Sequence, residues 1–285
     1  MRVLVTGASG HIGSAVVPEL IRAGHEVTGL ARSDAAAATV RALGAAARRG
    51  DTGDLGGLRE AAASADAVVH LAFNHDVMIS GDMAGAAAMD LATVGAFGGA
   101  LAGTGKAYIG IGLGNVVTAN PRSAVSAEVA AFAGRGIRSV LVAIPPVVHS
   151  TRDRAGFIPT LIQIARAKGV SGYVGDGASG WPAVHTLDLA TLYRLALEQA
   201  PAGSVLHAIA DEGVPTRAIA EVIGRHLGVP VVSVSPADAV GHFGWLATVF
   251  AVDGPASSAL TRELLGWQPV QPGLLDDLDQ GHYFA

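Results

Sequence analysis

The chain has 285 residues, of which 50% are hydrophobic and 15% are charged, so it is long and apolar enough to bury a core and is not a disordered polypeptide. Its formal net charge is −5 and its 19 Lys and Arg residues are scattered, which argues against a nucleic-acid partner and favours a small molecule. Cysteine is absent, which excludes disulfides, thiolate metal sites and a cysteine nucleophile.

Short β-rich runs alternate with alanine-rich helical stretches along the first half of the chain. This alternation predicts βαβ units, and hence an α/β fold with a doubly wound parallel sheet of the Rossmann type. We expect strands at 2–6, 26–30, 67–71, 107–111 and 137–143, and helices at 11–23, 55–63, 84–102 and 121–133.

The regular alternation ends at Pro145-Pro146. Beyond it, a helix at 187–199 and a strand at 205–209 are typical of a return to the sheet, whereas Gly-rich turns, aromatic residues and short helices fill the rest. We therefore expect a Rossmann core of residues 1–150 completed by 185–210, and a small C-terminal substrate-binding lobe made of 151–184 and 211–285.

A glycine motif, Gly7-Ala8-Ser9-Gly10-His11-Ile12-Gly13, joins the first strand to the first helix. In this setting glycines allow a tight turn, close approach to a pyrophosphate and packing of the helix on the sheet. The helix N-terminus adds free N–H groups and the positive end of a dipole. The alternative is a plain tight turn. The motif predicts a dinucleotide-binding loop with contacts from Gly7, Ser9, Gly10, His11, Ile12 and Gly13.

Arg32 and Ser33, after the second strand, indicate which dinucleotide is bound. In Rossmann proteins an acid at this strand end binds the ribose hydroxyls of NAD, whereas an Arg accommodates the 2′-phosphate of NADP. Here Ala31 takes the position of the acid, and Asp34 fits a helix N-cap better. A guanidinium binds phosphate bidentately, and Ser33 can add a hydrogen bond. We predict NADP(H) as the cofactor, with a solvated loop arginine as the alternative.

Two further segments complete the predicted cofactor site. Asp51 follows the third strand and is expected either to accept a hydrogen bond from the adenine amino group or to cap a turn. Leu71, Ala72 and Phe73 follow His70 at the end of the fourth strand. That end belongs to the carboxyl edge of the sheet, where ligands lie in doubly wound folds.

Together, the segments Thr6–Gly13, Arg32, Gly50-Asp51 and His70-Leu71-Ala72 resemble the extended and atypical short-chain dehydrogenase/reductase superfamily, in particular its NAD-dependent epimerase/dehydratase branch. Later segments are similar to the same group, so the likeness covers nearly the whole chain: Pro145–His149, Trp181–His185 with Asp188, and Leu265-Gly266-Trp267. The resemblance implies a Rossmann core with a small C-terminal substrate lobe and, at the family level, a homodimer.

The superfamily's catalytic Tyr-x-x-x-Lys motif is absent. In that motif Tyr transfers the proton at the substrate oxygen, and Lys lowers the pKa of Tyr. Neither Lys106 nor Lys168 has a Tyr four residues before it. By register the Tyr and Lys would fall near Asn120 and Ala124. The preceding strand, where the superfamily places Ser or Thr, reads Gly110-Ile111-Gly112-Leu113-Gly114 and carries no hydroxyl.

The strongest remaining polar group is Asn74-His75-Asp76, which follows the fourth strand near the expected nicotinamide end. His75 can exchange protons near neutral pH, and Asp76 can orient it or act as a base. Loop polarity without chemistry is the alternative. His149, after the sixth strand, is the third catalytic candidate. No metal site is expected, because the chain has no His-x-x-x-His and no dense carboxylate cluster.

Three functions are compatible with these residues. The first is an NADP(H)-dependent oxidoreductase that acts on a small, mostly apolar carbonyl or enone-like substrate with non-standard proton transfer, because hydride transfer requires chiefly that the nicotinamide be positioned. The second is a redox-neutral isomerase, cyclase, dehydratase or epimerase on the same fold. The third is a non-catalytic NADP(H)-binding protein.

A cytoplasmic location and no membrane partner are expected. The glycine motif comes too soon after Met1 to leave room for a signal peptide. Elsewhere Gly, Pro or a charge interrupts the apolar stretches before the roughly 18 residues that a membrane span needs.

Overall fold

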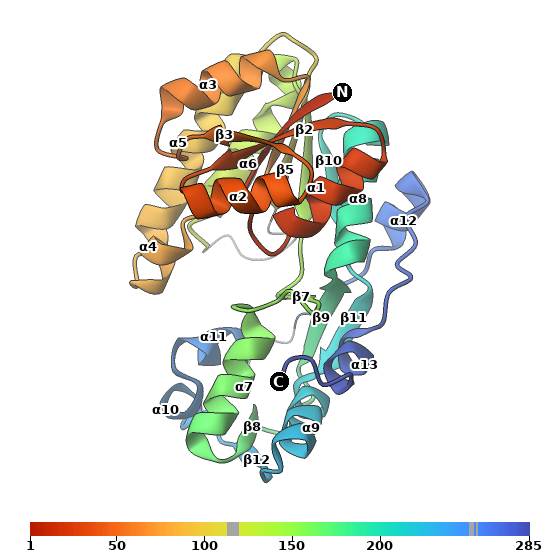
Figure 1. The fold of residues 1–285 in the computed structure, drawn as a ribbon. Coiled ribbons are helices and arrows are strands. Elements are labelled where there is room, and N and C mark those ends of the chain that lie inside the picture. Colours follow the sequence, from red (N-terminus) through yellow and green to blue (C-terminus); the bar gives the residue numbers. More distant parts are fainter. Residues whose placement is uncertain (113–119, 251–253, 255) are drawn as a thin grey trace. The chain divides into compact units, whose positions relative to one another are not determined.

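The computed structural model describes residues 1–112, 120–250, 254 and 256–285 (Figure 1). The chain divides into two compact units. The first contains Met1–Ala143, Leu189–His207 and Thr261–Trp267, and the second contains Ile144–Asp188, Ala208–Leu260 and Gln268–Ala285.

These boundaries differ from those expected at residues 144–150, 185–188, 208–210 and 261–267. Residues 144–150 belong to the second unit, because the strand that contains His149 pairs there with the strand that ends at His185. Residues 261–267 belong to the first unit, where the Thr261 hydroxyl accepts a hydrogen bond from the backbone of His207 and Trp267 is fully buried.

The first unit is built on a seven-stranded parallel sheet with the order β10-β6-β5-β4-β1-β2-β3. The order reverses between β1 and β4, and this topological switch point is where a doubly wound sheet binds its ligand. The predicted Rossmann-type α/β class is confirmed. The strands are β1 (Arg2–Thr6), β2 (Glu26–Ala31), β3 (Ala46–Arg49), β4 (Ala67–His70), β5 (Ala107–Gly112), β6 (Arg138–Ala143) and β10 (Ser204–His207).

Helices cover the sheet. Side chains of α3, α5 and α6 form one buried cluster with Leu4, Val68 and Tyr108, which point to the same face of the sheet. Val3 and Val5 alternate to the other face, which explains why the strands are apolar almost throughout. The helices are α1 (Gly13–Arg22), α2 (Asp34–Ala42), α3 (Leu55–Ser64), α4 (His75–Ile79), α5 (Met83–Leu101), α6 (Ser123–Ala131), the short 3-10 helix η1 (Ala133–Arg135), α8 (Thr186–Gln199) and α12 (Ala259–Leu265).

Helix α5 is long and apolar enough, by length and composition alone, to cross a membrane. Half of this stretch is buried inside the unit, where α5 packs against α3 and α6. The core helix of a folded domain passes the same test, so the composition of α5 matches its place in this unit.

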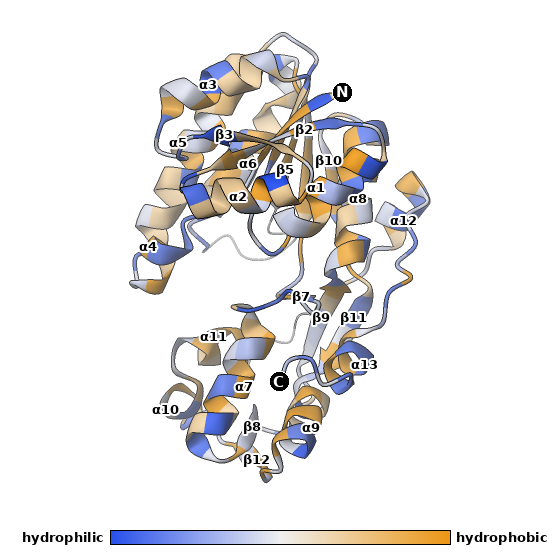
Figure 2. Ribbon diagram, in the orientation of Figure 1, coloured by the Kyte–Doolittle hydropathy of each residue, from blue (hydrophilic) through white to orange (hydrophobic). Residues whose placement is uncertain are grey.

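The second unit contains two small sheets. One has the order β11-β9-β7 and the other pairs β12 with β8. Hydrophobic and hydrophilic residues lie on different sides of helices such as α9 (Figure 2). The elements are β7 (Val147–His149), β8 (Ser171–Val174), β9 (Gly180–His185), β11 (Asp211–Pro215), β12 (Val231–Val234), α7 (Phe157–Lys168), α9 (Thr216–Leu227), α10 (Ala239–Phe243), η2 (Gly244–Leu246), α11 (Ala247–Phe250) and α13 (Leu274–Asp279).

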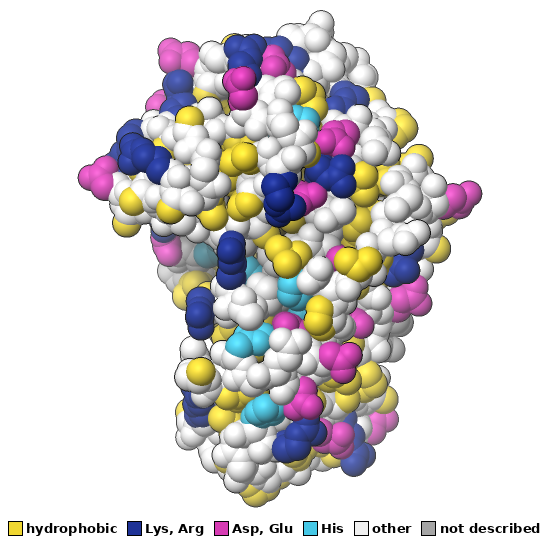
Figure 3. Space-filling view, turned by 45° about the vertical axis from the view of Figure 1, so that its right-hand side comes forward, with side chains coloured by type: hydrophobic (Ala, Val, Ile, Leu, Met, Phe, Trp, Pro, Cys, Tyr) yellow, Lys and Arg dark blue, Asp and Glu magenta, His cyan; other side chains and the backbone are white. Residues whose placement is uncertain are grey.

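The core of the second unit takes up several of its aromatic side chains. Trp181, Phe243 and Phe250 are almost completely buried. The Phe250 ring contacts the rings of Trp181 and Phe243 edge to face. These three rings therefore form core rather than the wall of an open apolar pocket. At the surface, Lys and Arg side chains are interspersed with Asp and Glu on the face shown in Figure 3.

Candidate functional site

The loop between β1 and α1 is a tight turn that requires glycine. Gly7 has a φ of 67°, and its carbonyl accepts a hydrogen bond from Gly10 N–H at 3.0 Å. A Cβ on Gly13 would lie 2.1 Å from the Gly7 oxygen, and a Cβ on Gly7 would lie 2.8 Å from Ala72 N. The loop thus packs directly on the chain that leaves β4, and no larger residue fits at either position.

Helix α1 begins without a side-chain cap. Its N-cap residue, Ile12, offers no side-chain acceptor, and no acidic residue lies in the first turn. No side chain of the first turn therefore neutralises the positive end of the α1 dipole, which can attract an external anion. The loop is thus of the kind that binds a dinucleotide diphosphate, and contacts of Ser9, Gly10 and His11 with it remain predictions.

Arg32, the residue predicted to bind the 2′-phosphate, lies just beyond the end of β2. Its Nη1 forms an ion pair with Asp76 Oδ2 at 3.1 Å, and the two side chains are 69% and 74% exposed. Asp76 was predicted to orient His75 or to act as a base. The structure instead places the Asp76 carboxylate on Arg32, because the first turn of α4 directs it toward the end of β2.

Ser33 and Asp51 have local partners. Ser33 is the N-cap of α2, where its Oγ accepts from Ala36 N at 3.1 Å, and its hydroxyl proton remains available to a phosphate. Asp34, expected as the N-cap, lies instead in the first turn of α2. Asp51 Oδ1 accepts from Gly53 N at 2.8 Å, so the turn-capping alternative describes this carboxylate.

His75 begins α4, with its ring edge-on to Phe73 at 5.3 Å. Burial lowers the pKa of His75 most, and the positive charge of Arg122 lowers this pKa further. A hydrogen bond with the backbone of Phe73 and the charge of Asp76 act in the opposite direction but do not overcome these effects. His75 is therefore neutral at pH 7 and can accept a proton.

A buried polar chain lies directly below the glycine loop. Thr6 Oγ1 accepts hydrogen bonds from the N–H groups of Leu71 and Ala72, both at 3.2 Å. Its own proton is therefore donated to His70 Nδ1, 2.6 Å away. This assigns the His70 proton to Nε2, which donates to Asp90 Oδ1 at 2.9 Å. These hydrogen bonds fix the end of β4, and with it the segment Leu71–Phe73.

Arg122 adds a positive charge to this series of polar contacts, at the carboxyl edge of the sheet. Its Nη2 lies 3.6 Å from Asp90 Oδ2, and the guanidinium carbon lies 4.4 Å from the centre of the Phe73 ring. A cavity of about 10 Å³, large enough for one water, lies among His70, Ala72, Asp90, Tyr108, Ile111, Arg122, Val125 and Val129. Sequence reasoning missed both Asp90 and Arg122.

The described residues contain no replacement for the missing Tyr and Lys at the expected positions. Asn120 Oδ1 accepts from the Arg122 backbone, and Ala124 lies in α6. On β5, Gly110, Ile111 and Gly112 carry no hydroxyl, and the remaining two residues of that motif, 113 and 114, lie outside the described residues.

Tyr108 and Lys106 do not form a catalytic Tyr–Lys pair at a different place in the fold. Tyr108 is completely buried, and burial raises its pKa well above the usual value. Lys106 Nζ donates to the Ala63 carbonyl at 2.7 Å, at the amino end of the strand. Tyr108 is therefore a core residue.

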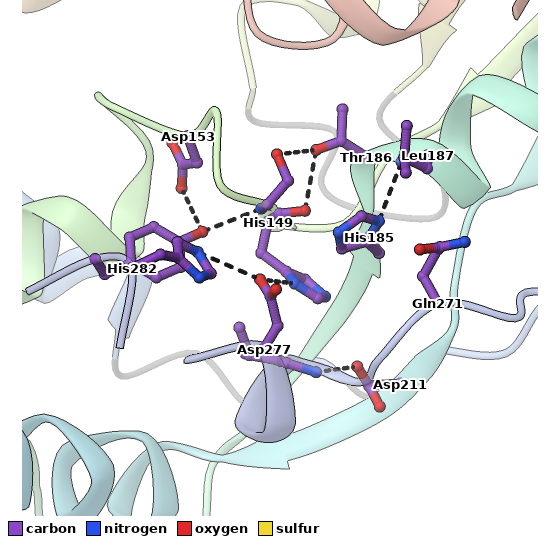
Figure 4. A network of polar contacts seen from close by, with 12 residues as sticks. His149, Asp153, His185, Thr186, Leu187, Asp211, Gln271, Asp277 and His282 are labelled. Carbon is purple, nitrogen blue, oxygen red and sulfur yellow. Dashed lines mark hydrogen bonds and ion pairs between the residues drawn. The ribbon is translucent and has the colours of Figure 1, made fainter. Parts of the chain in front are cut away.

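His149, the third predicted catalytic residue, lies inside the second unit (Figure 4). Its side chain is fully buried, and its Nδ1 is 2.8 Å from Asp277 Oδ2. The His185 ring packs edge-on against it at 5.3 Å, and His282 Nε2 lies 3.8 Å from the same Asp277 oxygen. His149 thus lies in the second unit with a buried acidic partner, because β7 pairs with β9 there.

The parallel sheet, its switch point and the glycine turn that precedes α1 define a dinucleotide-binding protein of the Rossmann type. The chain belongs to the NAD dependent epimerase/dehydratase family, whose model matches residues 3–90. It is 42% identical over 299 residues to the uncharacterized protein C2A9.02 of Schizosaccharomyces pombe, with 100% of both chains covered. It is 43% identical over 295 residues to the uncharacterized protein YLL056C of Saccharomyces cerevisiae, with 98% of both covered.

Solved structures share the fold. The UDP-glucose 4-epimerase of Thermotoga maritima with UDP-glucose has a TM-score of 0.78 at 20% identity, and 100% of this chain and 98% of that chain are covered. The dTDP-glucose 4,6-dehydratase of Streptomyces venezuelae with NAD and TYD has a TM-score of 0.76 at 21% identity, with 99% and 96% covered. The predicted resemblance to extended short-chain dehydrogenases/reductases is confirmed, and the chain is related to enzymes that bind a nicotinamide dinucleotide.

Proposed function

We propose that the chain is an NADP(H)-dependent oxidoreductase of this family that acts on a small carbonyl or enone-like substrate. The observation that carries the proposal is the end of β2. There Ala31 replaces the acid that would bind the ribose hydroxyls of NAD, and the exposed guanidinium of Arg32 follows it, with the Ser33 hydroxyl beside it.

The ion pair between Arg32 and Asp76 does not oppose this assignment. Both side chains are exposed, and an exposed ion pair contributes only about 0–1 kcal/mol. A 2′-phosphate also carries more negative charge than one carboxylate. NADP(H) is therefore expected to displace Asp76 from Arg32.

Proton transfer does not require the missing Tyr. Hydride transfer depends mainly on the position of the nicotinamide ring against its substrate, so water or the substrate itself can supply the proton. His75 is neutral at pH 7 because its pKa is lowered, so it can accept a proton in the reverse, alcohol-oxidising direction but is not the donor that carbonyl reduction requires.

Calorimetric titration with NADPH and NADH tests the cofactor. We expect NADPH to bind roughly ten- to a hundredfold more tightly than NADH, and Arg32→Ala to abolish the difference. Arg41→Ala, at an exposed position on α2, is the matched control and should keep it. Equal affinities in the wild-type protein would overturn the assignment. Absorbance at 340 nm across a carbonyl and enone panel then tests hydride transfer.

A redox-neutral reaction is the second candidate. It is favoured by the relationship to epimerases and dehydratases and by the absence of the Tyr-x-x-x-Lys pair. Product formation from a substrate without net oxidation of NADPH would support it. Stoichiometric oxidation of NADPH would exclude it.

A further inference from the structure

Arg122 is a cation whose hydrogen-bonding groups are largely unused. Its side chain is 18% exposed, and its buried Nε has no hydrogen-bond partner in the part of the chain that the structure describes. The nearest carboxylate oxygen, on Asp90, is 3.6 Å from Nη2, which is an ion-pair distance and too long for a hydrogen bond. A guanidinium has five N–H donors, so this arrangement leaves its planar fork ready for an acceptor.

The guanidinium is held in place rather than mobile. Phe73 stacks against it at 4.4 Å, and Asp90, itself 4% exposed, supplies the opposite charge. Asp90 is in turn fixed by His70 Nε2, whose other nitrogen is bound by Thr6. Every hydrogen bond from Thr6 to Asp90 has a single assignable direction. This series of hydrogen bonds therefore orients Arg122 and leaves its N–H donors unused.

Arg122 is connected to the dinucleotide loop through Phe73 and Ala72. The backbone of Ala72 is so close to Gly7 that a Cβ there would lie 2.8 Å from Ala72 N, and the next residue, Phe73, carries the ring under the guanidinium. The positive charge of Arg122 further lowers the pKa of His75, which burial lowers most. The cation thus lies near the carboxyl end of β4, among residues of β4, β5, α5 and α6.

We propose that Arg122 binds an oxyanion in this site. By register it falls between Asn120 and Ala124, the positions where the missing Tyr and Lys would stand. The bound group is the cofactor's diphosphate or a carboxylate of the substrate. The inference rests on the proposed function only in requiring a dinucleotide at the glycine loop. A guanidinium stays protonated, so Arg122 binds and orients the oxyanion but does not deliver a proton.

Binding titrations of wild-type protein and Arg122→Gln test the inference and separate the two sources. NADP⁺ carries the diphosphate, whereas 2′,5′-ADP has only one phosphate at the 5′ position. A loss of roughly tenfold or more for NADP⁺ with unchanged 2′,5′-ADP assigns Arg122 to the diphosphate. Unchanged NADP⁺ affinity with loss of benzoate binding to the NADP⁺ complex assigns it to a substrate carboxylate. Unchanged binding of all three probes overturns the inference.

Arg135→Gln is the matched control. Arg135 also pairs with a carboxylate, Glu128 at 2.7 Å, and stacks on a ring, Phe132 at 5.1 Å, but it lies in η1 at the far end of α6. Its replacement should leave all three affinities unchanged. An equal loss in both variants would mean that removal of any such cation weakens binding, and would overturn the inference.

Two further results keep the test decisive. If Arg122→Gln does not fold, Arg122→Lys decides, because Lys keeps the charge beside Asp90 but lacks the fork. It should weaken binding of NADP⁺ or of benzoate at least about threefold, and unchanged binding of both overturns the inference. If the wild-type protein itself binds no NADP⁺, the proposed function fails. That outcome is distinct from wild-type binding that Arg122→Gln leaves intact.

Discussion

At the scale of single residues, the ion pair between Arg32 and Asp76 sets two predicted site residues against each other. One was predicted to bind the cofactor and the other to act in catalysis, yet their side chains are 3.1 Å apart. If Arg32 binds the 2′-phosphate of NADP(H) as proposed, the carboxylate competes with that phosphate for the same guanidinium, and Asp76 is expected to lower cofactor affinity.

Replacement of Asp76 by Asn is expected to tighten NADPH binding by about two- to fivefold, because the competing charge is removed and an exposed ion pair is worth about 0–1 kcal/mol. Calorimetric titration measures the effect, which should shrink at high salt. NADH, which lacks the 2′-phosphate, is the internal control, and its affinity should not change. Equal gains for both cofactors would show that Asp76 acts in some other way.

At the scale of elements, the sequence predicted the core of the first unit closely. Each strand and helix predicted within residues 2–143 is present within two residues of its expected ends, because hydrophobic period and turn residues agree in these segments. Helix α4 was not predicted, since five residues are too few to show a helical period. It forms because Asn74 Oδ1 caps the backbone of Val77 at 3.1 Å.

The predicted site was incomplete for a different reason. The glycine loop and Arg32 are local signals, whereas the chain from Thr6 through His70 to Asp90 joins residues 64 and 20 positions apart. A signal for it was present, because Asp90 is the only charged residue in the predicted helix 84–102. A lone acid in an apolar helix indicates a buried partner, but the identity of that partner depends on the tertiary fold.

Removal of the Asp90 side chain should destabilise the protein by about 3–5 kcal/mol, because Arg122 loses its counter-charge and His70 Nε2 loses its acceptor in a buried site. Urea denaturation of Asp90→Ala measures the free energy of unfolding. Asp82→Ala, at the exposed N-cap of the same helix, is the matched control and should cost about 1 kcal/mol. Similar losses in the two variants would contradict a structural role for the buried chain.

At the scale of the whole molecule, each of the two units contains a buried polar network. In the first unit, hydrogen bonds link Thr6, His70 and Asp90, and Arg122 pairs with Asp90. The second contains the buried cluster of His149, His185, Asp277 and His282 (Figure 4). The sequence did not distinguish them, because His149 comes only six residues after the end of β6 and only the pairing of β7 with β9 reveals its unit.

The buried cluster of the second unit makes the free energy of unfolding depend on pH in the acidic range. Burial acts to raise the pKa of Asp277, but the hydrogen bond and charge of His149, with the charges of His282 and His185, outweigh it and hold this pKa below the usual value. The folded state therefore binds fewer protons than the unfolded state as pH falls toward the ordinary Asp pKa. The stability that Asp277 contributes is present above the unfolded pKa of about 3.9 and is lost as pH falls through the folded pKa.

Asp277→Asn is accordingly expected to lower the free energy of unfolding at pH 7 and to flatten its decline below about pH 4. Denaturation of the full chain at a series of pH values measures both effects. Asp276→Asn, at the exposed neighbouring position on α13, should keep the wild-type slope. The Asp277→Asn substitution removes only the contribution of Asp277. If this variant keeps the wild-type slope as well, the acid dependence arises from other carboxylates.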